Sequence, residues 1–319
     1  MIRAFRAVDG DASEVSADEA LRVARDADGM SWVDIDSESD EIVRALLLPC
    51  GVHPLVIEDI VHHTNRPKVD DYGDYLYIVV HSARWEAGQA KPSLREVDIV
   101  LGRKLLITAH EGETRSAATA AATLPRRPEL LARGPSYLLH FLLDVLVDHY
   151  LPITDRIAAD IDRLEELVFR HDRPESNRRV IRLKRGIAAL RRVVGPQRDT
   201  VLALTRDEFR AIPAEMRPYL RDVYDRLARV SDLLDSYRDE VATLLELQVS
   251  ITSNRMNEVI KRLTVIATIG LPLTVVTSFY GMNFELAEFR WAHGQWFVLG
   301  LLTLTALATW GYLRLRHWD

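Results

Sequence analysis

The sequence has little cysteine and no strong charge of one sign. A single cysteine, Cys50, stands among the 319 residues, so no disulfide can form within the chain, which fits a reducing compartment. The formal net charge of −6 at pH 7 is mild, whereas nucleic-acid-binding domains are usually basic. These absences argue against a disulfide-stapled secreted protein and against a nucleic-acid-binding protein.

Signals for catalysis and for export are also missing. The sequence has no P-loop, no GxSxG and no metal-hydrolase His pair, so we expect no enzyme. His62 and His63 are adjacent, and neighbouring histidines on a helix point in different directions, which disfavours a shared metal. Residues 1–15 contain no apolar h-region, so we expect no cleaved signal peptide.

Two long uncharged apolar runs stand near the end of the chain. Residues 263–280 and 296–313 each contain about 18 residues, the lower end of what spans a bilayer core as a helix. Tyr and Trp residues lie at or near the run ends, as in interfacial aromatic belts. The alternative is a pair of buried core helices. Basic residues before the first run and after the second place both termini in the cytosol, with the protein in the cell inner membrane.

The preceding residues predict an α+β fold. Strand-like runs rich in Val, Ile and aromatics alternate with helical patterns up to residue 135, and helical periodicity follows. The expected strands are 2–8, 31–35, 75–85, 95–102 and 104–110. We also expect one helix over 136–170 with a bend at Pro152, and a second over 178–194 that ends near Pro196.

These patterns divide the chain into seven parts. They are a cytosolic α/β domain (1–135), a helical hairpin (136–215), a stalk helix (216–262), a first membrane helix (263–283), an outer loop (284–295), a second membrane helix (296–313) and a basic cytosolic tail (314–319).

One helix connects the stalk to the first membrane segment. After Pro218 no glycine occurs until Gly270 and no proline until Pro272. Apolar residues recur in a 3,4 spacing from Leu220 to Ile251, the pattern of a coiled-coil seam. A helix this long needs partners along its length, so we expect an oligomer with the helix near its axis.

A stripe of small or polar residues follows the first membrane helix. Polar side chains that face lipid are costly, so the stripe should face an axis shared by neighbouring copies. Ordinary helix–helix packing through small residues is the alternative. The stripe consists of Thr264, Ala267, Leu271, Thr274 and Ser278, with Asn257 and Ile260 upstream.

The tripeptide Gly281-Met282-Asn283 ends this helix. Glycine permits a left-handed or sharp turn that stops a helix, and the Asn283 amide offers a neutral carbonyl oxygen. Mg²⁺ keeps several waters when bound, and a ring of amide oxygens can accept hydrogen bonds from that hydration shell. Glu285 and Glu288 in the loop would raise the local cation concentration at the entrance.

The chain resembles the CorA family of magnesium and cobalt transporters, which are two-transmembrane GxN divalent-cation channels. The matching motifs are YGMN (280–283), NEVIKRLTVIATIGLPLT (257–274), RDVYD (221–225), YRD (237–239), IEDI and NRPKV. The resemblance implies a homopentameric funnel. It also implies a selectivity filter at Gly281, Met282 and Asn283, an entrance lined by Asn257, and hydrophobic constrictions at Ile260, Leu263 and Leu271.

The resemblance further implies a regulatory Mg²⁺ site between subunits in the cytosol. Asp222 matches its stalk carboxylate, and Glu86 matches a position where Asp is familiar. Mg²⁺ bound there would favour the closed state. The loop departs from the family pattern because it contains Leu-Ala-Glu-Phe (286–289) where Met-Pro-Glu-Leu is common.

We therefore expect gated Mg²⁺ influx, with Co²⁺ and Ni²⁺ as secondary ions. A zinc transporter of the same superfamily is an alternative, although the stripe offers no His or Cys. A membrane-anchored sensor that conducts no ions is another. The expected partners are further copies of the chain, membrane lipid and divalent metal ions, and not nucleic acid.

Overall fold

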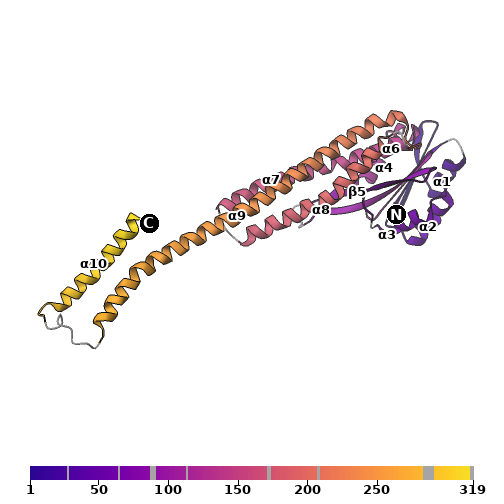
Figure 1. Ribbon diagram of the computed structural model, residues 1–319. Helices are drawn as coiled ribbons and strands as arrows, with labels where there is room; N and C mark the ends of the chain where they lie inside the picture. Colours follow the sequence, from indigo (N-terminus) through magenta and orange to yellow (C-terminus); the bar gives the residue numbers. More distant parts are fainter. Residues whose placement is uncertain are drawn as a thin grey trace. The chain divides into compact units, whose positions relative to one another are not determined.

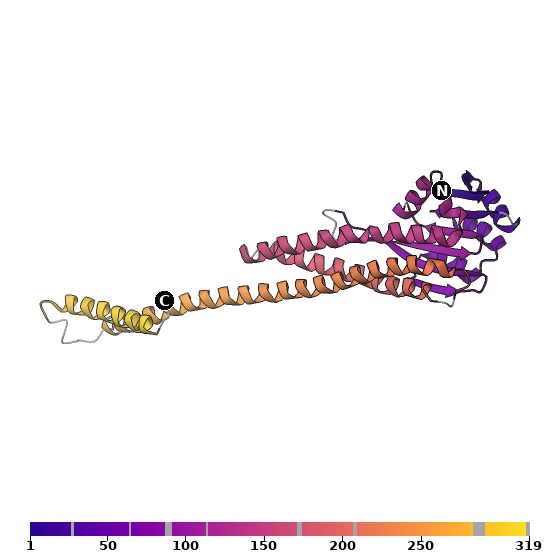
Figure 2. The same ribbon diagram turned by 90° about the horizontal axis from the view of Figure 1, so that it is seen from above.

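A computed structural model describes residues 1–26, 29–63, 65–86, 91–112, 114–170, 174–206, 209–282 and 291–316. The chain forms two compact units, Met1–Leu245 and Glu246–Asp319, and each is treated by itself below. Figures 1 and 2 show the elements of each unit from two directions.

A seven-stranded sheet forms the centre of the first unit. Its order is β2-β1-β3-β7-β6-β5-β4, and β3 pairs with β7 in parallel while the other neighbouring pairs are antiparallel. The strands are β1 (Ile2–Val8), β2 (Asp11–Val15), β3 (Met30–Asp36), β4 (Lys68–Asp71), β5 (Tyr75–Arg84), β6 (Ser93–Gly102) and β7 (Leu105–His110). The five expected strands are confirmed. β2 and β4 were not expected, because their sequences are short and polar.

Helices cover both faces of this sheet. Successive residues of β3 such as Trp32 and Val33 are both buried although they point to opposite faces. α1 (Ala17–Asp26), α2 (Asp40–Leu47) and α3 (Pro54–His62) cover one face with the short η1 (Leu48–Cys50). On the other side lie α4 (Arg115–Thr123), α5 (Glu129–Ala132) and the longer helices α6 to α8.

The long helices differ from the sequence expectation in two places. The single helix expected over 136–170 is two helices, α6 (Pro135–Asp148) and α7 (Tyr150–Arg170), because the break falls at His149 and not at Pro152. α8 (Pro174–Leu204) runs through Pro196, so the expected end there is wrong. Val201 and Leu204 beyond Pro196 are fully buried, and their packing offsets the lost backbone hydrogen bond.

α9 (Arg217–Tyr280) follows the short η2 (Ala214–Met216) and confirms the long continuous helix. Seven of the seam residues are buried within a single chain: Leu220, Val223, Leu227, Val230, Leu234, Val241 and Leu244. In both views this part of α9 lies beside α7 and α8 (Figures 1 and 2). Arg191 of α8 also pairs with Asp235 of α9. This part of the seam therefore packs within its own protomer and gives no evidence for an oligomer axis.

α10 (Gly294–Leu315) follows in the second unit and confirms the second apolar helix. α9 and α10 are both long and apolar enough to cross a membrane.

Candidate functional site

The second unit exposes a large apolar surface on both of its helices. Within the first unit, the same residue types are mostly buried. A soluble protein rarely exposes contiguous apolar surface of this kind. Such a surface marks a site of contact with a membrane or with another protein. The exposed large apolar residues of this unit include Val249, Met256, Val259, Ile260, Leu263, Ile266, Leu271, Val275 and Phe279 on α9, and Trp296, Leu299, Leu304, Leu307 and Trp310 on α10.

Half-buried residues of α9 gather on one side of this helix. They recur every three or four positions at Val265, Thr268, Pro272 and Val276. α10 has a matching half-buried side that includes Leu301, Leu302, Thr305, Ala306 and Thr309. α10 lies beside the C-terminal part of α9 in both views, and we attribute the partial burial of these two sides to this neighbour (Figures 1 and 2).

The predicted polar stripe lies on a different side of α9. Asn257, Ile260, Ala267, Leu271, Thr274 and Ser278 are exposed, Thr264 is half-buried at the edge, and Leu263 is exposed as well. α10 therefore leaves the stripe uncovered, and packing between the two helices of one chain does not account for it.

The threonine hydroxyls of the stripe are turned toward their own backbone. Thr264 Oγ1 donates to the Ile260 carbonyl at 2.8 Å, and Thr274 Oγ1 donates to the Gly270 carbonyl at 2.9 Å. Each proton is used within the helix, so the oxygen presents only acceptor lone pairs outward. Acceptors of this kind suit the hydration shell of a cation.

A shallow groove of about 420 Å³ lies at the end of this exposed side. Its lining joins three stripe residues to Met282, the second residue after the helix. The lining residues are Leu271, Thr274, Val275, Ser278, Phe279 and Met282. Met282 of the predicted filter therefore lies next to the polar stripe.

Gly281 lies in the turn directly after α9, as expected. Of the two expected kinds of turn, the left-handed one is not adopted, because the φ of Gly281 does not lie in the left-handed region. Its N–H donates to the Thr277 carbonyl at 2.9 Å, and a Cβ at this position would lie 3.1 Å from the same oxygen. Glycine is therefore favoured by close approach of backbone. Asn283, Glu285 and Glu288 lie outside the described residues.

The two predicted regulatory carboxylates have separate partners in one chain. Asp222 pairs with Arg226 at 3.1 Å, and Arg226 also bonds to Asp144 and Asp148 of α6. Glu86 pairs with Arg84 at 2.6 Å. Carboxylate oxygens suit Mg²⁺, and both side chains are largely exposed. The sequence alone does not assign Asp144 and Asp148 to this contact, because it does not show that α6 meets α9.

A second carboxylate cluster, not predicted, joins α3 to β6. Single ligand atoms of His63, Glu96 and Asp98 lie within 4.8 Å of one another, a spacing that could hold a metal ion. Protein donors already occupy this cluster. Asp98 accepts from Tyr77 Oη at 2.6 Å and contacts His63 at 3.1 Å, while Glu96 accepts two bonds from Asn65. The cluster is therefore a hydrogen-bonded network that needs no metal.

Burial and mutual repulsion raise the pKa values of the carboxyl groups in this network. Burial, followed by the charge of Asp98, raises the pKa of Glu96 to about 7. The hydrogen bond to Asp98 raises the pKa of His63 above its ordinary value, although burial opposes it. Burial likewise raises the pKa of Asp98, although its bonds to His63 and Tyr77 oppose the rise.

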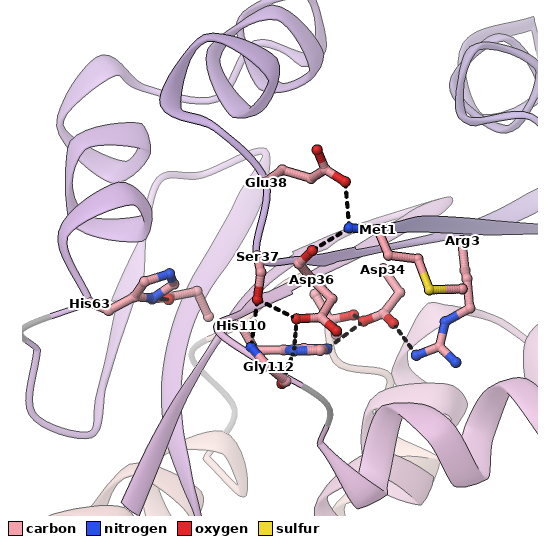
Figure 3. Close-up of polar contacts among 11 residues, drawn as sticks. Met1, Arg3, Asp34, Asp36, Ser37, Glu38, His63, His110 and Gly112 are labelled. Atoms are coloured by element: carbon pink, nitrogen blue, oxygen red, sulfur yellow. Dashed lines mark hydrogen bonds and ion pairs between the residues drawn. The ribbon is translucent and has the colours of Figure 1, made fainter.

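A third polar network lies at the carboxyl ends of the parallel pair β3 and β7 (Figure 3). His110 Nε2 contacts Asp34 at 3.1 Å and Nδ1 contacts the Gly112 carbonyl at 2.9 Å, while Arg3 donates to Asp34 at 2.8 Å. Burial tends to raise the pKa of Asp34, but bonds from His110, Thr108 and Arg3 hold it below its ordinary value. These mutual bonds make the network structural.

The fold and the uncovered stripe define a class: an α/β domain followed by two membrane-spanning helices with a polar face left free by the second helix. The family model described as "CorA-like Mg2+ transporter protein" matches residues 27–315. The chain therefore belongs to this family, and the resemblance in its motifs is confirmed.

Individual relatives agree over nearly the whole length. The chain is 33% identical over 304 residues to the cobalt/magnesium transport protein CorA of Thermotoga maritima, which covers 94% of this chain and 86% of that protein. It is also 33% identical over 277 residues to the putative metal ion transporter YfjQ of Bacillus subtilis, which covers 85% and 84%. The structure of the CorA magnesium transporter from Methanocaldococcus jannaschii matches with a TM-score of 0.87 at 19% identity, over 100% of this chain and 99% of that one.

Proposed function

We propose that the chain is a divalent-cation channel that mediates Mg²⁺ influx, with Co²⁺ and Ni²⁺ as secondary ions. The observation that carries this proposal is the polar stripe of α9, which α10 leaves uncovered. A second support is the name of the Thermotoga maritima relative, a cobalt/magnesium transport protein.

The stripe becomes a conduit when several copies surround one axis. The described part of a single chain has two candidate spans, which cannot enclose a path, so the proposal requires an oligomer. We propose a homopentamer on the family resemblance. In this arrangement α9 lines the path and α10 faces lipid. Both termini lie in the cytosol, and the inner membrane potential favours inward movement by about 2.3 kcal/mol per charge per 100 mV.

Selectivity is assigned to Gly281, Met282 and Asn283 at the outer end. Five Asn283 amide oxygens accept hydrogen bonds from the water that Mg²⁺ retains, which binds the ion weakly enough for release. Glu285 and Glu288 concentrate cations at this entrance. Deeper in the path, exposed Ile260, Leu263 and Leu271 form constrictions that close by dewetting.

Regulation is assigned to Asp222 and Glu86 of neighbouring subunits. Both are exposed carboxylates, and Mg²⁺ held between subunits favours the closed state. Depletion of cytosolic Mg²⁺ then releases the subunits and opens the path.

Ion flux into liposomes tests the channel. The full-length protein is reconstituted, and Mg²⁺ entry is followed with a trapped indicator under an imposed potential. We expect Asn283→Ala to lower Mg²⁺ selectivity over monovalent cations by about tenfold, a loss of ~1.4 kcal/mol. Thr303→Val, at an exposed position of α10, is the matched control and should conduct normally. Absence of flux in the unaltered protein would favour a sensor that conducts no ions.

Zinc transport is the second candidate, as the alternative within the same superfamily that the sequence left open. The ZntB cytoplasmic domain from Vibrio parahaemolyticus matches with a TM-score of 0.63 at 16% identity, over 80% of this chain and 98% of that one, which shows the fold alone. Zinc prefers nitrogen and sulfur ligands, and the stripe supplies only hydroxyl, amide and apolar groups. Zn²⁺ flux that exceeds Mg²⁺ flux in the same liposomes would reverse the order of these candidates.

A further inference from the structure

A cavity of about 320 Å³ in the first unit is lined by four arginines. It lies where the end of β5, the start of β6, the beginning of α4 and the start of α7 meet. We call it the arginine cavity, and its charged lining residues are Arg84, Arg95, Arg115, Arg156 and Glu86. Among the described lining residues, four guanidinium groups and the imidazole of His149 accompany a single carboxylate, so the cavity favours an anion.

The N-terminus of α4 opens into the same cavity. Thr114 is the N-cap residue of this nine-residue helix and has the extended conformation usual for a cap (φ −103°, ψ 135°). A capping threonine normally accepts a hydrogen bond from an N–H of the first turn, but Thr114 makes no such bond. The first turn therefore keeps backbone donors that its own cap does not use, and such donors bind anions.

The Thr114 hydroxyl itself lacks a partner. The residue is only 1% exposed, and its Oγ1 atom has no hydrogen-bond partner among the described residues. A buried hydroxyl without a partner destabilises the folded protein, and a bound acceptor would recover that loss. Ser116 in the first turn of α4 is also buried and lines the cavity. An acceptor-rich ligand satisfies these donors together.

The surrounding side chains are held in place by the fold. Arg156 donates to the Trp85 carbonyl, and Arg84 pairs with Glu86. The Arg95 guanidinium lies over Gly112, where any Cβ would collide with it. The Trp85 ring lies against Gly186 of α8 in the same way. These contacts restrain Arg84, Arg95 and Arg156 before a ligand arrives, which lowers the entropic cost of binding.

From these observations we propose that the arginine cavity binds the phosphate group of a small molecule. Phosphate matches the donor set, because guanidinium groups, a helix N-terminus and hydroxyls are its usual partners. The volume lies at the lower end of the range of about 300–1,000 Å³ for small-molecule sites, so the ligand has room beyond the phosphate itself. The site is separate from the proposed ion path, although Glu86 of its lining is also assigned to the proposed regulatory site, and it adds an anionic ligand to a cation transporter.

Calorimetric titration of the purified full-length protein tests the site. The titrants are inorganic phosphate, ADP and a short-chain phosphatidic acid, all with EDTA so that no metal links ligand to protein. Binding by any of the three supports the proposal, and their order of affinity tells free phosphate, nucleotide and lipid headgroup apart. We expect Arg115→Gln and Arg156→Gln each to weaken binding by about tenfold. Arg22→Gln, at an exposed position of α1, is the control and should bind normally.

Thr114→Val separates a ligand site from a structural role. The change removes the unpartnered hydroxyl and keeps the shape of the side chain. We expect the melting temperature of the ligand-free protein to stay equal or rise, while phosphate binding weakens by about tenfold. A fall in melting temperature with unchanged binding would assign the hydroxyl to the fold. Absence of binding by all three titrants, or equal binding in Arg115→Gln and Arg22→Gln, overturns the proposal.

Discussion

The Nδ1 atom of His63 lies 3.1 Å from Oδ2 of Asp98, and this contact ties the end of α3 to β6. His63 is the C-cap residue of α3. Its backbone has a left-handed conformation (φ 46°, ψ 44°), which residues other than glycine rarely adopt. Two neighbouring histidines thus have different surroundings, because only His63 turns toward the buried carboxylates.

This network predicts that the protein loses stability as pH rises. The folded chain keeps a proton on Glu96 up to about pH 7, whereas the unfolded chain releases it near the ordinary value of 4.5. The raised pKa of His63 acts in the same direction, because its contribution is present below 6.5 and is lost as pH rises through the folded value. His81, 4.0 Å from Glu96, acts in the opposite direction, because burial lowers its pKa to about 4 and the folded protein gains stability as pH rises from there to 6.5. The net fall in melting temperature should therefore appear between about pH 6.5 and about pH 8.

Glu96→Gln tests the source of this pH dependence. Glutamine keeps an acceptor for the Asn65 N–H but does not titrate. We expect the melting temperature of the variant to fall less steeply with pH. Relative to the unaltered protein, the variant should gain most in melting temperature at the alkaline end. Glu14→Gln, at an exposed position of β2, is the control. Equal slopes in both variants would mean that Glu96 is not the titrating group.

Gly281 and Gly270 are two glycines of one segment with different surroundings. A Cβ on Gly281 would lie 3.1 Å from the Thr277 carbonyl, whereas a Cβ on Gly270 would meet nothing within 4 Å. Gly281→Ala should displace the helix end and lower Mg²⁺ flux by about tenfold, while Gly270→Ala should keep flux and slightly stabilise the helix. Liposome flux and melting temperature distinguish them. Equal losses in both would show that any added methyl group disturbs the segment.

The threonines of α9 provide a matched test of the stripe. Thr274 is exposed on the stripe, and Thr268 is half-buried on the side that faces α10. Thr274→Val removes an outward oxygen from the proposed path and should lower Mg²⁺ flux severalfold, about 1 kcal/mol in barrier height. Thr268→Val should leave flux near normal. Greater loss in Thr268→Val would place the ion path on the other side of the helix.

Sequence patterns predicted the elements whose burial is regular. β1 and β5 are rich in apolar residues, because the sheet is covered on both faces. α9 and α10 could be predicted because each is a long segment with few helix-breaking residues. Pro196 was misjudged because a proline predicts a helix end only when packing does not compensate for the missing N–H. The seam of α9 was assigned to other copies because periodicity shows that a face is buried but not what covers it.

For the same reason, only part of the candidate site could be predicted from the sequence. The stripe could be found by helical spacing, since its residues lie within one helix. The contact of Asp222 with Asp144 and Asp148 through Arg226 joins α6 to α9, which lie far apart in sequence. The unpartnered Thr114 hydroxyl depends on side-chain geometry that no sequence spacing encodes.

Asp222→Asn tests the proposed regulatory site. Its side chain is 70% exposed, and Arg226 keeps Asp144 and Asp148 as partners when Asp222 loses its charge, so the fold should survive. Mg²⁺ bound to the folded protein raises its melting temperature in proportion to the logarithm of concentration over Kd. We expect the variant to need about tenfold more Mg²⁺ for the same rise.

Asp225→Asn is the matched control for this experiment, because Asp225 is exposed on the same helix three residues further along. Its Mg²⁺ response should equal that of the unaltered protein, and Glu86→Gln should respond as Asp222→Asn does. Combining Glu86→Gln with Asp222→Asn should add little to either change alone, because each removes one end of the same bridge. Fully additive losses would instead mean that the two carboxylates bind separate ions, and Glu86 would then no longer be the partner of Asp222.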